Sequence, residues 1–147
     1  MLPDGRRLGA HLALGHGMVR AAERARAIGA RTIQVFADNP TAWRRRQSLP
    51  RELPAFRRVL ADADLEPISI HAPYLVNLAG DDPVVAERSC AALARELEVG
   101  AAYGAAFVNV HIGSHRGAGV ERGVKRVADN VARVLAAARP DGPAPRL

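Results

Sequence analysis

The sequence predicts the first four units of a parallel β/α barrel, and three observations carry this prediction. Short apolar segments alternate four times with longer segments of helical periodicity. Glycine or proline marks most of the joins between them, and two of the predicted strands end on a histidine. Strands that alternate with amphipathic helices pack as a parallel sheet covered by helices. We therefore expect an α/β fold.

The first two units follow from local pattern. Residues 8–14 form an apolar run bounded by glycine, which predicts a buried strand, and residues 19–28 continue with helical periodicity. Gly29 ends this helix as a C-terminal cap. Residues 32–36 (TIQVF) are rich in β-branched residues and predict the second strand, and residues 51–63 predict the second helix.

The third and fourth units repeat the pattern. Residues 67–71 predict a strand, and a long helix over 83–103 begins on a proline and ends before Gly104. Residues 106–111 predict the fourth strand, and residues 121–138 the fourth helix. Right-handed crossovers between parallel neighbours predict the strand order 1-2-3-4.

Four units are too few to close a barrel. A (β/α)8 TIM barrel usually takes about 250 residues, so we expect residues 1–147 to be the N-terminal half of a TIM-barrel domain, truncated after about four units. Residues 144–147 resemble the entrance to a fifth strand. An unpaired edge on the fourth strand predicts self-association or aggregation. A compact doubly wound sheet of four strands is the alternative, because periodicity alone does not exclude it.

Composition predicts a soluble, cytoplasmic protein. No apolar stretch approaches the roughly 18–20 residues of a membrane span, and the N-terminus lacks the apolar core of a secretion signal. The single cysteine, Cys90, permits no internal disulfide, and its surroundings predict a buried helix position. The net charge of +6 is nearly all arginine. It is compatible with an anionic partner, and equally with an arginine-rich proteome.

Two histidines are the candidate metal ligands. His71 and His111 each stand at the C-terminal end of a predicted strand, which is the face where parallel β/α folds build active sites. Two imidazoles delivered there by neighbouring strands can share one divalent metal, and their nitrogens suit zinc, manganese or iron. One such histidine alone is more often a hydrogen-bonded residue, whereas two at equivalent positions favour a metal site.

The segments around these histidines resemble a known family. Residues 71–79 (HAPYLVNLA) and 110–115 (VHIGSH) are similar to the corresponding stretches of the endonuclease IV family, zinc-dependent enzymes that cut DNA at abasic sites. Residues 9–12 and 34–43 (QVFADNPTAW) resemble the family more weakly, because related sugar-isomerase-like barrels share such segments. The resemblance runs from residue 8 to about residue 138.

The resemblance implies roles for individual residues. His71 and His111 match two histidines that hold one zinc of a three-zinc cluster, which makes a hydroxide nucleophile. No catalytic residue is separable from that metal site. Tyr74 and Leu75 match residues of a DNA-facing loop that wedges at the lesion, and Asn39 lies on the exit loop of the second strand. The implied partner is double-stranded DNA with abasic sites.

Three further residues have weaker assignments. Trp43 lies on the same loop as Asn39 and either faces the DNA or anchors the core. His11 is expected to line the floor of the site, and His115 to support the fourth loop by hydrogen bonding rather than by binding metal. The family commonly has a basic residue where this chain has Thr41, which weakens the case for insertion into the minor groove.

The resemblance leaves most metal ligands without a counterpart. The carboxylates and the further histidine that the family uses lie on strands five to eight, and Glu121 and Asp129 fall on the outer fourth helix instead. We therefore expect at most one partial Zn(II) site and no activity from residues 1–147 alone. A sugar isomerase or epimerase of the same barrel type, and a non-catalytic remnant with a basic binding surface, are the alternatives.

Overall fold

The computed structural model describes residues 4–147, and this part of the chain folds as four strands that alternate with four helices. The strands are β1 (Gly9–Leu12), β2 (Thr32–Val35), β3 (Ile68–His71) and β4 (Phe107–Asn109), and the helices are α1 (Met18–Ala27), α2 (Leu53–Asp62), α3 (Pro83–Tyr103) and α4 (Val120–Ala137). Every predicted element is present. The strands, however, are shorter than the apolar runs that predicted them.

The strands form one parallel sheet in the order β1-β2-β3-β4. Ile33 of β2 pairs with Ala10 of β1 and with Ile68 of β3, and Ile70 of β3 pairs with Val108 of β4. The predicted order is confirmed. A doubly wound sheet would place later strands on the other side of the first strand, so the alternative fold is excluded.

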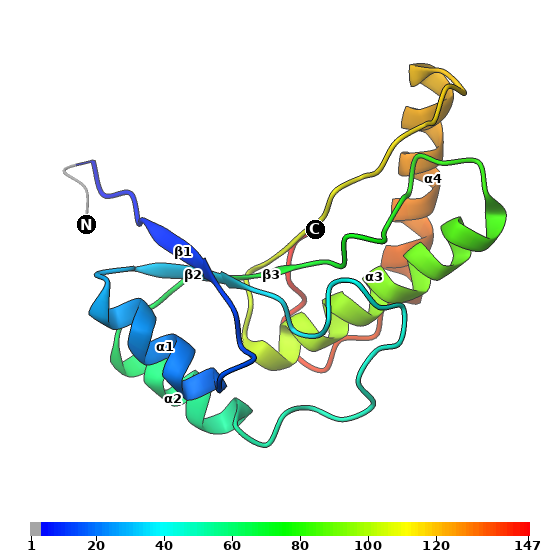
Figure 1. Ribbon diagram of the computed structural model, residues 1–147. Helices are drawn as coiled ribbons and strands as arrows, with labels where there is room; N and C mark the ends of the chain where they lie inside the picture. The colour runs from blue at the N-terminus through cyan, green and yellow to red at the C-terminus, as the bar shows by residue number, and fades with distance from the viewer. Residues whose placement is uncertain (1–3) are drawn as a thin grey trace.

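The hydrophobic core lies between one face of the sheet and the helices. Val35, Ile70 and Phe56 are completely buried there, as expected when apolar side chains leave water. In Figure 1, α1 and α2 lie side by side beneath the strands, and no helix of the described residues covers the opposite face of the sheet. Cys90 is buried in α3, as predicted. In the described part of the chain no helix is both long enough and apolar enough to cross a membrane.

The ends of α3 follow from residue type. Asp82 precedes the helix and its Oδ1 accepts hydrogen bonds from the backbone N–H groups of Val84 (2.8 Å) and Val85 (3.1 Å). Pro83 occupies the first helical position, where no N–H donor is needed. Gly104 ends the helix with φ 72°, a left-handed conformation that glycine adopts without strain.

The outer edge of β4 is partly paired, so the expectation of an unpaired fourth strand is wrong at this point. Arg146 forms a parallel bridge with Phe107. The N–H of Val108 donates to the Arg146 carbonyl at 2.7 Å, and the N–H of Arg146 donates to the Ala106 carbonyl at 2.9 Å. The predicted entrance to a fifth strand is therefore present, in the position that the fifth strand of a barrel takes.

Candidate metal centre

The uncovered face of the sheet carries the candidate site. Side chains alternate across a strand, so the positions between the core residues point to this face. They include His11 on β1, Gln34 on β2, and His71 and Asn109 in register on β3 and β4. His111 follows β4 by two residues. Three strands therefore deliver three histidines to one region.

His71 and His111 lie close together at the C-terminal rim of neighbouring strands. Their ring centroids are 5.1 Å apart, with the planes tilted by 47°. His71 is 7% exposed, whereas His111 lies on the exposed loop after β4. The predicted adjacency of these two side chains is confirmed. Their role as metal ligands stays a prediction.

The backbone fixes how the His71 ring carries its proton. Nδ1 of His71 lies 2.7 Å from the carbonyl oxygen of Ala72. Because a carbonyl only accepts hydrogen bonds, Nδ1 must donate, and in the neutral ring Nε2 then keeps its lone pair. Metal-binding histidines are oriented in this way by a carbonyl on their other nitrogen. His71 therefore has the tautomer that a metal requires.

A series of polar side chains on the uncovered face of the sheet supports the histidines. The His11 ring stacks on the His71 ring at a centroid distance of 5.7 Å and an angle of 25°. Gln34 Nε2 lies 3.0 Å from His11 Nδ1, and Asn109 Nδ2 donates to Gln34 Oε1 at 3.2 Å. Loss of water around its ring, and secondly the charge of His71, lower the pKa of His11. His11 thus lies against His71 on the same face of the sheet, and its place in a metal site stays a prediction.

Two aromatic rings enclose His71. Phe36, the residue after β2, has its ring centroid 4.9 Å from that of His71 and 4.6 Å from that of His11. Tyr74 lies 5.5 Å from His71 and 6.3 Å from His111. Phe36 was not among the predicted site residues. Its place two residues after Gln34, on the same face of β2, is the signal that could have found it.

The predicted DNA-facing residues lie on adjoining loops. Tyr74 is 56% exposed and its N–H donates to the Pro40 carbonyl at 3.0 Å, which joins the loop after β3 to the loop after β2. Leu75 is half-buried beside it. Asn39 is exposed, and its Oδ1 accepts hydrogen bonds from the backbone N–H (3.0 Å) and hydroxyl (2.9 Å) of Thr41. Tyr74, Leu75 and Asn39 therefore occupy one rim with His71.

Trp43 and His115 are placed differently. Trp43 is half-buried and lines a groove against α3, apart from the histidine cluster. Its DNA-facing role stays a prediction. His115 Nδ1 lies 3.2 Å from the backbone N–H groups of both Gly117 and Gly119. It accepts these hydrogen bonds and holds the loop before α4, as predicted.

Asn77 connects the loops that carry the two histidines. Its Oδ1 accepts hydrogen bonds from the N–H groups of Gly80 and Ser114, both at 3.0 Å, and its Nδ2 donates to the Ser114 carbonyl at 3.2 Å. Gly113 lies against this side chain with φ 89°. Sequence reasoning did not single out Asn77, because its partner Ser114 is 37 residues away.

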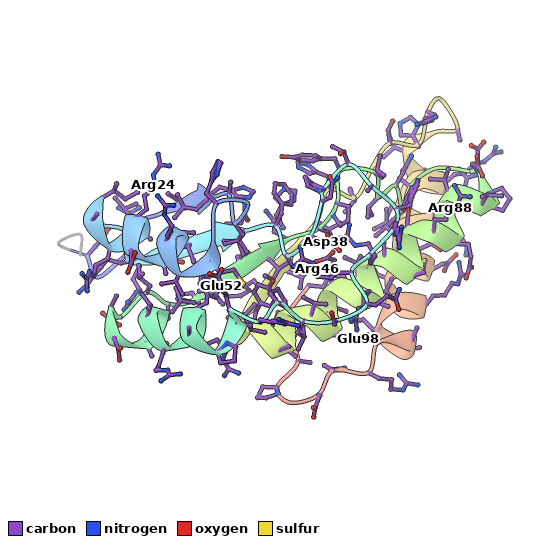
Figure 2. All side chains as sticks on the ribbon, turned by 60° about the horizontal axis from the view of Figure 1, so that its bottom comes forward. Arg24, Asp38, Arg46, Glu52, Arg88 and Glu98 are labelled. Carbon is purple, nitrogen blue, oxygen red and sulfur yellow. The ribbon has the colours of Figure 1, made fainter. Side chains whose placement is uncertain are left out.

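A buried ion pair holds the loop after β2 on α3. Arg45 Nη2 bonds Glu96 Oε1, and Arg45 Nη1 donates to the carbonyls of Asn39 (2.9 Å) and Ala42 (3.2 Å). Burial, partly offset by Arg45, raises the pKa of the Glu96 carboxyl. Figure 2 shows Asp38 and Arg46 of the same loop close together above α3, where the Arg46 N–H donates to Asp38 Oδ2. This network sets the position of the loop.

The two rim histidines are candidates for two ligands of one zinc ion, and the described residues offer no larger cluster. Within residues 4–147, no three histidine, cysteine, aspartate or glutamate side chains are grouped so that they could hold a metal. Glu121 and Asp129 are exposed on α4, as expected, and Asp129 pairs with Lys125 at 2.6 Å. The carboxylates that would bridge several zinc ions are therefore missing from the described part of the chain.

Comparison with known proteins gives a consistent result. A family model described as xylose isomerase-like TIM barrel matches residues 22–143. A relative from Natranaerobius thermophilus, described as a probable endonuclease 4, is 37% identical over 129 residues, which are 88% of this chain and 45% of the relative. The chain thus spans about half the length of the curated relatives it matches.

Solved structures that resemble the chain include an endonuclease IV and an epimerase. The crystal structure of endonuclease IV from Thermus thermophilus superposes with a TM-score of 0.76 at 37% identity, over 89% of this chain and 46% of that one. A D-allulose 3-epimerase from Methylomonas sp. superposes at 0.60 with 16% identity, over 90% of this chain and 48% of that one, which shows a shared fold alone. The four β/α units therefore match about half of an endonuclease IV TIM barrel.

Proposed function

The chain belongs to the xylose isomerase-like TIM barrel family and is related within it to endonuclease IV, and from this premise we propose that it forms the N-terminal half of a zinc-dependent endonuclease that cuts DNA at abasic sites. The observation that carries the proposal is the pair of histidines on the strand rim. Their ring centroids are 5.1 Å apart, and the Nδ1 hydrogen bond of His71 leaves its Nε2 free for a metal.

His71 and His111 would hold the zinc ion through ring nitrogens. A zinc ion in such a site supplies a hydroxide nucleophile and stabilises negative charge on the phosphate. The Ala72 carbonyl fixes the His71 ring, and the His11 ring supports it from below. Two neutral ligands bind zinc weakly compared with three or four. The remaining ligands of an active site must therefore come from outside the described residues.

The neighbouring loops would bind the DNA. Tyr74 is more than half exposed directly beside the two histidines. The backbone hydrogen bond between Tyr74 and Pro40 joins the loop after β3 to the loop after β2. Leu75 and Asn39 lie on these loops. An aromatic and an aliphatic side chain at this place could separate stacked bases. Sugar epimerisation has less support, because the likeness to epimerases lies in the fold.

A chimeric barrel tests this proposal directly. Residues 1–143 would be fused to the part of Thermus thermophilus endonuclease IV that this chain does not cover. We expect the chimera to incise an abasic-site duplex when zinc is present. Substitution of either ligand, His71→Ala or His111→Ala, should lower the incision rate by about 100-fold or more, because each removes a direct metal ligand.

The control is His16→Ala, which changes an exposed histidine in the turn before α1. This variant should incise at the rate of the unchanged chimera. Circular dichroism and zinc content establish that each protein is folded and loaded. A folded, zinc-loaded chimera without incision would refute the proposal, and so would incision that survives the loss of both rim histidines.

A further inference from the structure

A second candidate site lies on the outside of the fold, between the loop after β2 and the first half of α3. An open groove of about 450 Å³ is lined by Trp43, Arg44, Arg45, Arg88, Ala91 and Ala92. Arg88, Ala91 and Ala92 are three and four residues apart, so they share one face of α3. The two alanines leave room above the helix, and the half-buried Trp43 ring forms one wall.

The groove is positively charged, and its charge is not neutralised. No acidic residue of the described part of the chain lines it. Arg44 and Arg88 are exposed, and within residues 4–147 neither side chain has an ion-pair or hydrogen-bond acceptor. The acidic side chains nearby on α3 already form ion pairs with other arginines: Glu87 with Arg133, and Glu96 with Arg45. Two guanidinium groups are therefore available at one place.

The wall of the groove is held in place by the buried ion pair. Arg45 bonds Glu96 of α3 and also the carbonyls of Asn39 and Ala42, next to Trp43. The loop is thus attached to the helix that forms the floor. A preformed wall loses little entropy on binding. This favours a binding site over a chance arrangement of exposed arginines.

We propose that this groove binds a phosphodiester of a nucleic-acid strand, with the adjacent base against the Trp43 ring. Guanidinium groups bind phosphate oxygens in pairs of parallel hydrogen bonds. An indole face stacks on any of the bases, which gives affinity without sequence preference. Arg44 and Arg88 supply the first interaction and Trp43 the second. The floor of two alanines leaves space for the sugar.

The groove is distinct from the histidine rim, and the choice of nucleic acid rests on the proposed function. Trp43 makes no ring contact with the histidine cluster in the described part of the chain. A strand bound at the groove would lie beside α3 while another part of the nucleic acid reaches the rim. The groove therefore extends the surface that holds the substrate beyond the lesion itself.

Trp43 is the only tryptophan of the chain, so its fluorescence reports on this groove alone. The 147-residue protein would be titrated with a single-stranded oligodeoxynucleotide about eight nucleotides long, in EDTA so that no metal takes part. We expect saturable quenching of Trp43. The double variant Arg44→Ala/Arg88→Ala should bind about 10-fold or more weakly at low salt. Its slope of log K against log salt should be shallower by about 1.4, which is about 0.7 for each lost phosphate contact.

The matched control removes the same charge elsewhere. Arg24 and Arg26 are exposed on α1, and Figure 2 shows Arg24 at the opposite end of the molecule from Arg88. The variant Arg24→Ala/Arg26→Ala should change affinity by less than about 2-fold. An equal loss in this control would overturn the proposal, because general charge would then explain binding. Binding that leaves Trp43 fluorescence unchanged would overturn it too.

Two further arms identify the ligand. Inorganic phosphate and poly-glutamate should quench Trp43 far less than the oligonucleotide does; quenching by poly-glutamate at equal or lower concentration would overturn the proposal in favour of an acidic protein partner. The His71→Ala/His111→Ala variant should quench normally. The quenching experiment therefore does not depend on the zinc site. The groove proposal and the proposed endonuclease function can thus fail independently of each other.

Discussion

At the scale of single residues, Glu96 is the most deeply buried charged side chain within residues 4–147. It is 2% exposed, and its Oε2 has no hydrogen-bond partner within residues 4–147. Burial disfavours its charge and raises the pKa of the carboxyl, while Arg45 opposes this effect through charge and a hydrogen bond. A buried ion pair of this kind stabilises little by itself, but breaking it leaves an uncompensated charge.

Arg45→Met should therefore lower the free energy of unfolding by about 3 kcal/mol at pH 7, because Glu96 is left buried without its partner. The raised pKa fixes the sign of the pH dependence. The cost of ionising Glu96 is absent below its ordinary pKa of 4.5 and grows as the pH rises through the raised value. The stability gap between the two proteins should thus narrow from pH 7 towards pH 4.5. Urea unfolding measures it.

Arg58→Met is the control, since Arg58 is exposed on α2. It should change stability by less than about 0.5 kcal/mol. The double variant Arg45→Met/Glu96→Gln should recover most of the loss, because no charge remains buried. A gap that does not depend on pH would contradict the account, since the cost would then come from lost packing.

At the scale of elements, local sequence was sufficient where the signal was local. Proline and glycine at the two ends of α3 predicted both of its boundaries. The start of α1 shows what local sequence cannot supply. The first N–H of this helix, on Met18, donates a hydrogen bond to Glu52 Oε2 at 2.7 Å, and Glu52 lies 34 residues later in the chain. Strand length was also overestimated, because apolar residues that flank β1 leave the sheet to form loops.

The candidate site shows the same division. His71 and His111 could be predicted because His71 ends a strand, His111 lies two residues after one, and both belong to distinctive motifs. Phe36, Gln34 and Asn109 complete the site only when the strands are in register, and the sequence shows no register. Contacts between loops are harder still to predict.

The loop that carries His111 provides a test at this scale. Gly113 has φ 89°, and a Cβ there would lie 2.0 Å from Asn77 Oδ1 and 2.7 Å from Asn77 Cα. Gly113→Ala must therefore displace the backbone and break the hydrogen bonds of Asn77. We expect a loss of about 2–3 kcal/mol in the free energy of unfolding, from lost hydrogen bonds and left-handed strain together. Denaturant unfolding measures this loss.

Gly117→Ala separates the two causes. Gly117 has φ 90°, nearly the same as Gly113, but open space surrounds its Cβ position. This variant carries the backbone strain alone and should lose about 1 kcal/mol. Equal losses in the two variants would show that the contact with Asn77 contributes nothing. In that case the connection between the two histidine-bearing loops would be unimportant for stability.

At the scale of the whole molecule, the helices complete one side of the sheet and leave the other side open. The open face carries polar residues and rings, among them His11, Gln34 and Phe36, rather than a continuous apolar surface. The segment at Arg146 covers part of the β4 edge. Within residues 4–147, β1 pairs only with β2. Self-association should therefore involve the β1 edge more than the β4 edge that we first expected.

The same incompleteness predicts that residues 1–147 with added zinc do not cut DNA. Two histidines supply two neutral ligands, and the described residues group no carboxylate with them. An activated hydroxide therefore cannot be aligned with a phosphate. Incision of an abasic-site duplex should not exceed that of His71→Ala/His111→Ala, while weak binding that falls with rising salt remains. Zinc-dependent incision that disappears in that variant would contradict this prediction. It would mean that two copies of the chain assemble into a working site. In that case the incision rate should depend on the protein concentration.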